Sequence, residues 1–421
     1  MVGSSRALSG VRVLEMTVAV AGPVACHVLG DMGAEVIKVE EPNSRLHTPR
    51  PLPPPRPGAK DHPFNRVPNW IELNRSKRHL ALNVASPEGR DIFLKVAAIS
   101  DVVVENFSPR VMGNLGIDYE DLKKVNPSII MVSMPAFGKT GPYKSRSSYG
   151  PGIDAMSGIS HLTGYPDRGP GKPANFFCDQ NAGLHAAFCT MAALRHRRRT
   201  GEGQYIELSM LEGEVQFAAP AIMEAMISGV DGMRIGNRHQ FYAPHGVYPC
   251  RGEDQWIAIA VTSDEAWKSL CRVMERPDLA DDPRFAERSR RYENQDLADE
   301  AITAWACQHD PLDAQEVLQD AGIAAASALR VNELFADPQV THRGSFSWVD
   351  HPELGPFPHT RTAWRSFQGN NGVGGPAPLF GDGDDYVLRD LLGMRLEDVE
   401  RLTQAGIVSR APIGWEPEKA D

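Results

Sequence analysis

The sequence predicts an α/β protein with two domains: a large doubly wound domain built on a parallel sheet, and a smaller α+β domain. Strand-like and helix-like segments alternate through the first half of the chain, and the pattern changes near residue 229. The length of 421 residues also exceeds the roughly 250–300 that one hydrophobic core fills. We therefore assign residues 1–225 to the large domain, 226–350 to the small domain, and 351–421 to a C-terminal segment that returns to the large domain.

The first strand is predicted over residues 11–15, where apolar and polar side chains alternate. A helix follows over residues 23–32, with Pro23 near its first turn, and a second strand spans residues 35–40. Strand, helix and strand within about 30 residues form a βαβ unit, which implies parallel pairing with a right-handed crossover. The alternation continues with a helix over 87–98 and with strands over 101–105, 129–133 and 204–209.

The second half of the chain carries the mixed signals of an α+β domain. Residues 247–250 and 255–261 flank a polar turn and predict a hairpin. An amphipathic helix follows, because apolar side chains recur at helical spacing at Trp267, Leu270, Cys271 and Met274. A last helix is predicted from Leu391, Leu392, Leu396, Val399 and Leu402. The proline-rich stretch 49–58 fits neither a helix nor a central strand, so we expect a surface loop there.

Composition excludes several classes of function. The net charge of −10 argues against non-specific binding to nucleic acid or to anionic membranes. The six cysteines form no C-x-x-C pair, so we expect reduced thiols and no zinc site. No apolar run approaches the ~18 residues of a membrane helix, and residues 1–14 do not resemble a signal peptide. We therefore expect a cytoplasmic protein.

The opening βαβ unit invites a dinucleotide-binding interpretation, with Glu40 placed like a ribose-binding carboxylate. The glycine pattern does not support it. Residues 19–23 lack the G-x-G-x-x-G sequence, and Pro23 lacks an N–H that a pyrophosphate cradle would use. NAD binding is therefore disfavoured. The N-terminus of the helix either attracts a phosphate group through its free N–H groups or is simply the start of a structural helix.

Three polar segments are candidates for ligand contact. The basic stretch 73–78 is either a solvated loop or a phosphate-binding loop. Asn106 and Phe107 directly follow a strand, at the edge where open parallel sheets bind ligands; Phe107 either covers an adenine ring or plugs the end of the sheet. The arginine-rich stretch 195–199 ends a long helix, where cations complement the helix dipole, so we assign it a structural role.

Asp179 lies between a strand-like apolar run and a predicted helix over residues 180–195. Aspartate is a favoured N-cap residue, so a capping role is one interpretation. A carboxylate fixed at such a corner, near backbone N–H groups, is also suited to act as a nucleophile. The pattern alone leaves both roles open.

Taken together and in order, these segments resemble the class III coenzyme A transferases, the group that contains formyl-CoA and carnitine CoA-transferases. The matching segments are residues 8–15, 21–23, 29–40, 74–77, 101–107, 115–116, 126–127, 137–142 and 199–204. Each motif alone is weak, but the ordered set is specific and runs nearly from end to end.

The resemblance implies an architecture and a reaction. Members of the family are dimers in which two chains are threaded through each other like linked rings. In the transferases an aspartate of the large domain attacks the acyl-CoA thioester, which gives an aspartyl anhydride and then an aspartyl-CoA thioester. Asp179 matches that aspartate, so the resemblance favours the nucleophile over the cap. Coenzyme A is then a substrate moiety, and neither a metal nor a permanently bound cofactor is required.

The resemblance also implies a CoA site on this chain. The positions that match family contacts are Val20, Ala21, Asn74, Lys77, Asn106, Phe107 and Tyr149. Two positions depart from the family pattern. Asn114 stands where an arginine often lies, with Arg110 as its candidate substitute, and Glu41 stands where a basic residue often follows the second strand. Both departures affect the expected phosphate contacts.

Two observations separate this chain from other members of the superfamily. The α-methylacyl-CoA racemases use a histidine and an aspartate as acid and base, and the position matching that histidine is Tyr149 here. Formyl-CoA transferase has a glycine-only loop in its small domain, which residues 236–245 do not reproduce. The chain thus resembles the carnitine-type branch, and we expect a substrate larger than formate or oxalate.

The expected function is transfer of CoA from an acyl-CoA donor to a free carboxylic acid. The alternatives are a racemase-like acid–base enzyme and a catalytically silent CoA-binding partner subunit, which the presence of Asp179 disfavours. A homodimer is expected, with a hetero-oligomer formed with a paralogue as the alternative. Arg238, His239 and His245 either bind the acceptor carboxylate or hold the small domain together.

Overall fold

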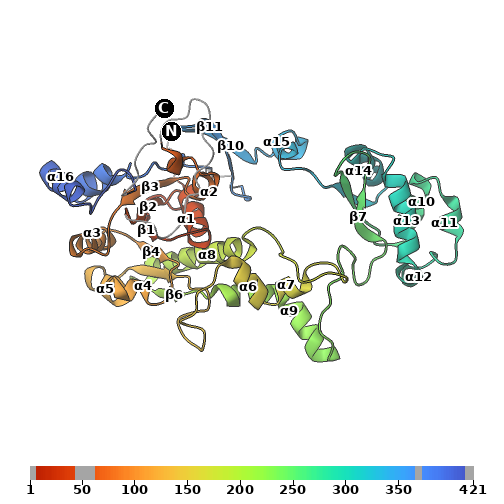
Figure 1. The fold of residues 1–421 in the computed structure, drawn as a ribbon, viewed down its shortest axis with the longest axis horizontal. Helices are drawn as coiled ribbons and strands as arrows, with labels where there is room; N and C mark the ends of the chain where they lie inside the picture. The colour runs from red at the N-terminus through yellow and green to blue at the C-terminus, as the bar shows by residue number, and fades with distance from the viewer. Residues whose placement is uncertain (1–5, 43–61, 366–371, 413–421) are drawn as a thin grey trace, which may run out of the picture. The chain divides into compact units, whose positions relative to one another are not determined.

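A computed structural model describes residues 6–42, 62–365 and 372–412 of the chain (Figure 1). The chain divides into two compact units. The larger unit combines Met1–Ser160, Lys172–Gly229 and Thr341–Asp421, and the smaller unit combines His161–Gly171 and Val230–Val340. The proline-rich stretch 49–58 lies outside the described residues.

The larger unit is built on a six-stranded parallel sheet, which confirms the predicted doubly wound fold. Its strands are β1 (Arg12–Met16), β2 (Glu35–Glu40), β3 (Lys77–Ala81), β4 (Val102–Glu105), β5 (Ile130–Ser133) and β6 (Tyr205–Glu207). Their spatial order is β3-β2-β1-β4-β5-β6. The order therefore reverses between β1 and β4, and ligands of such sheets bind outside the carboxyl ends of the two strands at this point.

Helices cover both faces of this sheet because neighbouring strand residues point to opposite sides. Val13 belongs to the core formed with α1 (Ala21–Asp31) and α8 (Phe177–Thr200). Leu14 belongs to the core formed with α3 (Pro87–Ala98), α5 (Tyr119–Val125) and α16 (Leu396–Gln404). Since α16 packs into this second core, the C-terminal segment joins the large unit.

The smaller unit contains a three-stranded antiparallel sheet in the order β7-β8-β9. Its strands are β7 (His245–Pro249), β8 (Trp256–Ala260) and β9 (Ala324–Ser327). The sheet packs with α10 (Asp264–Val273), α13 (Gln295–Ala306) and α14 (Pro311–Asp320). The predicted hairpin and the helix with buried Trp267 and Leu270 are therefore confirmed.

Several elements differ from or add to the predictions. The single predicted C-terminal helix is two pieces, a π-helical turn over Tyr386–Leu391 and α16, separated by Gly393 with φ +67°. A hairpin of β10 (Phe346–His351) and β11 (Gly355–Thr360) was not expected from the sequence. The remaining helices are α2 (Pro68–Leu73), α4 (Val111–Asn114), α6 (Gly150–Met156), α7 (Ile159–Leu162), α9 (Met210–Ser228), α11 (Pro277–Asp281), α12 (Arg288–Glu293) and α15 (Pro338–His342), with single 3-10 turns at Pro63–Asn65 and Glu333–Phe335. Among the described residues, no helix combines the length and apolar character needed to cross a bilayer.

Candidate active site

A pocket of the larger unit opens where the strand order reverses. Val18 and Ala19, which follow β1, line it together with Asn106 and Phe107, which follow β4. The same pocket is lined by Tyr149, Gly150 and Asp179. Four of the residues predicted for the site, Asn106, Phe107, Tyr149 and Asp179, therefore meet in one pocket at the edge where ligands of this fold bind.

Asp179 lies in the first turn of α8, and no strand precedes it. The predicted strand before Asp179 and the predicted helix start at residue 180 are wrong, because Phe176 takes a left-handed conformation (φ 58°) and the chain turns directly into a helix at Phe177. Cys178 is thereby directed into the core, where it is fully buried. The N-cap position belongs to Phe176, so the capping interpretation of Asp179 is also wrong.

The environment of the Asp179 carboxylate makes it unusually basic. Its side chain is almost buried, and this burial, together with the negative charge of Asp154, raises its pKa to about 6. Hydrogen bonds from its own backbone N–H and from that of Ala21 act in the opposite direction and favour the ionised form. At neutral pH Asp179 is therefore mostly ionised, but it is a stronger base than an exposed aspartate.

The glycine at position 150 allows the pocket wall to approach this carboxylate closely. A Cβ atom at Gly150 would lie 2.1 Å from Oδ2 of Asp179, which is far inside van der Waals contact. Only a glycine at position 150 is therefore compatible with the observed conformation of the Asp179 side chain.

Asn106 joins the ends of β1 and β4. Its Oδ1 accepts a hydrogen bond from the Val18 backbone N–H at 2.8 Å, and its Nδ2 donates to the Val18 carbonyl oxygen at 2.8 Å. This double contact fixes the segment that leads from β1 into Val20 and Ala21 at the start of α1. Asn106 thus positions the backbone N–H of Ala21 that reaches Asp179.

Asn74 ends α2 and Lys77 begins β3, and neither lines the pocket. The buried Lys77 ammonium lies 2.8 Å from Oε2 of Glu15, and it donates hydrogen bonds to the carbonyl oxygen of Pro23 and to Oδ1 of Asn74. Burial lowers the pKa of Lys77 to about 8, against the opposing effect of Glu15. The Lys77 ammonium thus already has protein partners in this structure. The phosphate contact expected from the family stays a prediction.

Two cations of the pocket were not predicted from the sequence. Lys144 and Arg146 line it from the segment between β5 and α6, whereas Arg110, the expected substitute for the family arginine, does not. The signal that could have identified them is their place just before Tyr149, in a polar stretch with no helical or strand periodicity.

The small-unit candidates are already engaged with neighbouring groups. Arg238 forms ion pairs with Asp296 and Asp299. Nδ1 of His239 accepts hydrogen bonds from the backbone N–H groups of Phe241 and Tyr242. These contacts support structural roles for Arg238 and His239.

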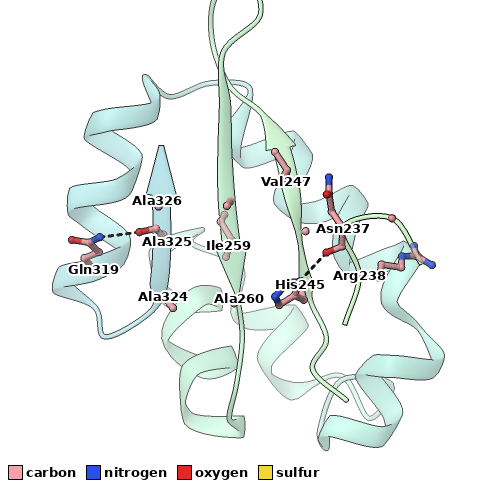
Figure 2. Close-up of a pocket in the computed structure, with 13 residues that line it drawn as sticks. Asn237, Arg238, His245, Val247, Ile259, Ala260, Gln319, Ala324, Ala325 and Ala326 are labelled. Atoms are coloured by element: carbon pink, nitrogen blue, oxygen red, sulfur yellow. Dashed lines mark hydrogen bonds between the residues drawn. The ribbon is translucent and has the colours of Figure 1, made fainter. Parts of the chain in front are cut away.

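His245 is hydrogen-bonded through Nδ1 to the Asn237 carbonyl oxygen. Figure 2 shows His245, Asn237 and Arg238 beside a largely apolar hollow of about 650 Å³ over the sheet of the smaller unit. Acceptor binding by Arg238, His239 or His245 stays a prediction.

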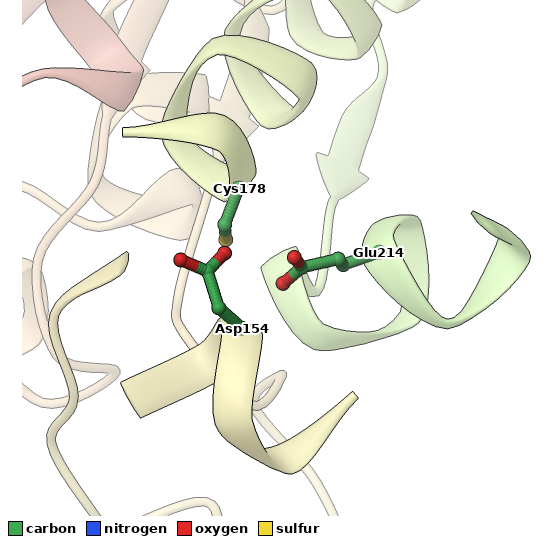
Figure 3. A group of neighbouring side chains, drawn as sticks. All are labelled: Asp154, Cys178 and Glu214. Carbon is green, nitrogen blue, oxygen red and sulfur yellow. The ribbon is translucent and has the colours of Figure 1, made fainter. Parts of the chain in front are cut away.

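Beside Asp179, three buried side chains from three helices converge (Figure 3). Asp154 of α6, Cys178 of α8 and Glu214 of α9 each bring one polar atom within 4.8 Å of the others. Burial, with the three neighbouring acids, raises the pKa of the Cys178 thiol, so it stays protonated. The cluster offers three side chains, one short of the four-ligand set of a structural zinc site. The cluster was not predicted from the sequence, because its members are far apart in the chain.

Comparisons with known proteins agree with this geometry. A family model described as CoA-transferase family III matches residues 8–384. The chain is 32% identical over 403 residues to the succinyl-CoA–D-citramalate CoA-transferase of Chloroflexus aurantiacus, covering 96% of this chain and 98% of that protein. It is 32% identical to the succinate–glutarate CoA-transferase of Agrobacterium fabrum, covering 94% and 96%.

The chain belongs to CoA-transferase family III. Its fold agrees with that assignment: a CAIB/BAIF family protein from Brucella suis superposes with a TM-score of 0.84 at 31% identity, covering 92% of this chain and 100% of that one. The predicted family is therefore confirmed, and the protein is an enzyme that transfers coenzyme A.

Proposed function

We propose that this CoA-transferase moves coenzyme A from an acyl-CoA donor to a free carboxylic acid through covalent intermediates on Asp179. The observation that carries the proposal is the buried, basic carboxylate of Asp179, which lines the pocket at the reversal point and is held by two backbone N–H groups. A carboxylate suits transfer between acids because its mixed anhydride can be reopened by a thiolate.

The proposed reaction first forms an anhydride at Asp179 and then a thioester at the same residue. An oxygen of Asp179 bonds to the acyl carbon while the C–S bond breaks, and CoA leaves as a thiolate. The thiolate attacks the aspartyl carbonyl, the C–O bond to the acyl group breaks, and the donor acid leaves as a carboxylate. The acceptor carboxylate then reverses both steps. The N–H of Ala21 and that of Asp179 itself are placed to bind the oxyanion formed when the aspartyl carbonyl is attacked.

The CoA moiety is assigned to the residues that match family contacts: Val20, Ala21, Asn74, Lys77, Asn106, Phe107 and Tyr149. Tyr149 is 82% exposed, so its ring is free to contact a ligand at the pocket mouth. For the phosphates we add Lys144 and Arg146, because they line the pocket while Asn114 replaces the family arginine.

The substrates are proposed from the activities of the relatives. Two proteins that are 32% identical to this chain are named for succinate or succinyl-CoA together with a second dicarboxylate, glutarate or citramalate. We therefore propose succinyl-CoA as the donor class and a dicarboxylate as the acceptor class. A panel of mono- and dicarboxylic acids offered with succinyl-CoA and with acetyl-CoA tests this choice. The carnitine-type branch and a cytoplasmic location stay predictions.

The two alternative functions make different predictions. A racemase would exchange the α-hydrogen of a branched acyl-CoA with solvent deuterium, but Tyr149 replaces its histidine. A silent partner subunit would bind CoA and transfer nothing with any pair of acids. The presence of Asp179 in the pocket favours transfer over both.

A homodimer is proposed from apolar side chains that α8 and α9 leave uncovered. They are Leu184, Phe188, Phe217, Met223, Met226 and Ile227, exposed by 50%, 68%, 51%, 56%, 79% and 87%. So many exposed large apolar side chains on two packed helices are typical of an interaction surface. A second copy of the chain is the occupant we propose, and a paralogous chain is the alternative.

The central test is Asp179→Asn. The variant should keep its fold, because Asp179 is not the N-cap of α8, yet its turnover should fall by several orders of magnitude because the covalent route is lost. Asp118→Asn, a change of the same kind at the N-cap of α5, should leave turnover unchanged. Wild-type protein incubated with acyl-CoA alone should carry a thioester at Asp179 that intact-protein mass spectrometry detects. Normal transfer by a folded Asp179→Asn protein, free of deamidation, would refute the mechanism.

A further inference from the structure

The cluster beside the nucleophile contains two buried carboxyl groups that face each other. Figure 3 shows the carboxyl groups of Asp154 and Glu214 turned toward one another, with Cys178 above them. Asp154 is 1% exposed and Glu214 is fully buried. Among the described residues, their four oxygens have no hydrogen-bond partner apart from each other and the Cys178 thiol.

Two charged carboxylates cannot occupy such a place together, since both burial and mutual repulsion penalise the second charge. Burial, followed by the neighbouring Asp154, raises the pKa of Glu214 to about 8. Asp154 itself acts on its neighbours as a charged group. At neutral pH the pair therefore carries one proton and one negative charge.

That remaining charge acts on the nucleophile. Asp179 directly follows Cys178 in the first turn of α8, and the charge of Asp154 is the second cause, after burial, of its increased basicity. The groups that face this region are Asp154 from α6, Cys178 and Asp179 from α8, Glu214 from α9 and the backbone N–H of Ala21 from α1. His185 of α8 packs against Gly213, next to Glu214 in α9. The charged side chains acting on Asp179 in the described part of the chain are thus acidic.

We propose that Asp154 and Glu214 share one proton and that the charge they retain favours the acylated states of Asp179. The proposal rests on the proposed function, in which Asp179 forms an anhydride and a thioester. Asp179 is uncharged in both intermediates. In the anhydride its carboxyl oxygen is bonded to the acyl group, and in the thioester its carbonyl carbon is bonded to the sulfur of CoA. Acylation therefore relieves the repulsion from Asp154, just as protonation does. Asp154 is the positioning residue that acts through Asp179, and Glu214 holds the proton of the pair.

This equivalence gives a quantitative test with Asp154→Asn. The acid limb of the profile of kcat/KM against pH should move down by about one pH unit, because a neighbouring charge is removed while burial persists. The ratio of acylated to free enzyme with acyl-CoA and no acceptor should fall by the same factor, roughly tenfold for one pH unit. Glu212→Gln, on the same helix but exposed, is the matched control and should change neither quantity.

Glu214→Gln completes the test, because the glutamine side chain imitates the neutral, protonated form of Glu214. It should retain the acid limb and the acylated fraction of the wild type at neutral pH. Thermal unfolding of each variant verifies that the fold is intact. An acid limb or an acylated fraction that Asp154→Asn leaves unchanged would overturn the proposal, and so would a stoichiometric metal ion that Glu214→Gln loses.

A second readout separates this proposal from the proposed function. In protein labelled with ¹³C at the aspartate carboxyl carbon, the Asp179 resonance is identified by its absence in Asp179→Asn. Its titration should move to lower pH in Asp154→Asn whether or not any acid is transferred. A moved titration without a covalent intermediate in the wild type would refute the proposed function alone. An unmoved titration would refute the acid pair.

Discussion

At the residue scale, Asn106 shows how one side chain can determine the shape of a binding site without contributing charge. Its amide satisfies both backbone groups of Val18, so the ends of β1 and β4 stay aligned at the pocket. The segment it holds includes Ala19 with φ 56°, a left-handed conformation that costs free energy for a residue other than glycine. The clamp is therefore one source of the stability that this conformation needs.

Asn106→Ala should weaken CoA binding as well as the fold. Loss of two partly buried hydrogen bonds costs about 1–3 kcal/mol of stability, and the loosened segment should raise the Kd for CoA roughly tenfold. Asn126→Ala is the matched control, because the Asn126 side chain hydrogen-bonds Ala97, Ser100 and Ser128 before β5, at the opposite end of the strands. It should lose at least as much stability with an unchanged Kd. Equal effects of both variants on the Kd, measured by calorimetry, would contradict the clamp.

The pH dependence of stability is also set by single residues. The pKa of Glu214 in the fold is raised to about 8 from its ordinary 4.5, so the native state binds more protons than the unfolded chain between these values. Its favourable contribution is complete below pH 4.5 and is lost as pH rises through 8. The melting temperature of the wild type should therefore fall over this range. Glu214→Gln should show a shallower decline, while Glu212→Gln keeps the wild-type slope; identical slopes in all three would count against a buried, protonated Glu214.

At the element scale, the approach of α1 to α8 brings the Ala21 N–H to Asp179. The approach depends on Gly183, where a Cβ atom would lie 2.6 Å from Val24 and 2.8 Å from the carbonyl oxygen of Ala21. The backbone of Ala21 and the branched side chain of Val24 therefore leave no room for a side chain at position 183.

Gly183→Ala should therefore push the two helices apart, while Gly213→Ala in α9 meets only side chains that can move, at 3.3 Å or more. Both changes gain a similar helix propensity of about 1 kcal/mol. The difference in stability between the two variants therefore measures the packing effect alone. Gly183→Ala should be less stable than Gly213→Ala by about 1–3 kcal/mol. Its turnover should also fall, because Ala21 moves away from Asp179. Equal stabilities in denaturant titrations would show that α1 tolerates the shift.

Elements with a clear period could be predicted from the sequence, and those fixed by tertiary contacts could not. Alternation and apolar runs identified five of the six strands of the parallel sheet, since both depend only on which side chains face the core. The third strand, β3, was not predicted, and the basic stretch 73–78 that was expected to be a loop overlaps its start at Lys77. The start of α8 was missed because it depends on the left-handed Phe176 and on the burial of Cys178, neither of which has a local signal. In the same way, motif order located Asn106, Phe107, Tyr149 and Asp179, whereas the pairing of Asp154 with Glu214 exists only in the folded chain.

At the scale of the whole molecule, we expect a dimer of about twice 46.1 kDa by light scattering at micromolar concentration. Linked rings bury far more than the ~1,600 Å² of a standard interface, so dilution should not dissociate them. Ile227→Glu should reduce the dimer fraction, because Ile227 is 87% exposed in one chain and belongs to the apolar surface of α8 and α9. Leu396→Glu, at the exposed start of α16, should not. A wild-type monomer at this concentration would contradict the linked-ring architecture that the family resemblance implies.

The large unit is assembled from separated stretches of the sequence. This arrangement limits when each part can fold during synthesis. Val399, Leu402 and Val408 complete the core that β1 and α3 begin, and Leu82 forms a β-bridge with Val408. On the ribosome, this face of the sheet stays uncovered until residues 399–408 have been made. Apolar surface is therefore exposed from the time β1 and α3 emerge, so this enzyme should need chaperones until that late stage of translation.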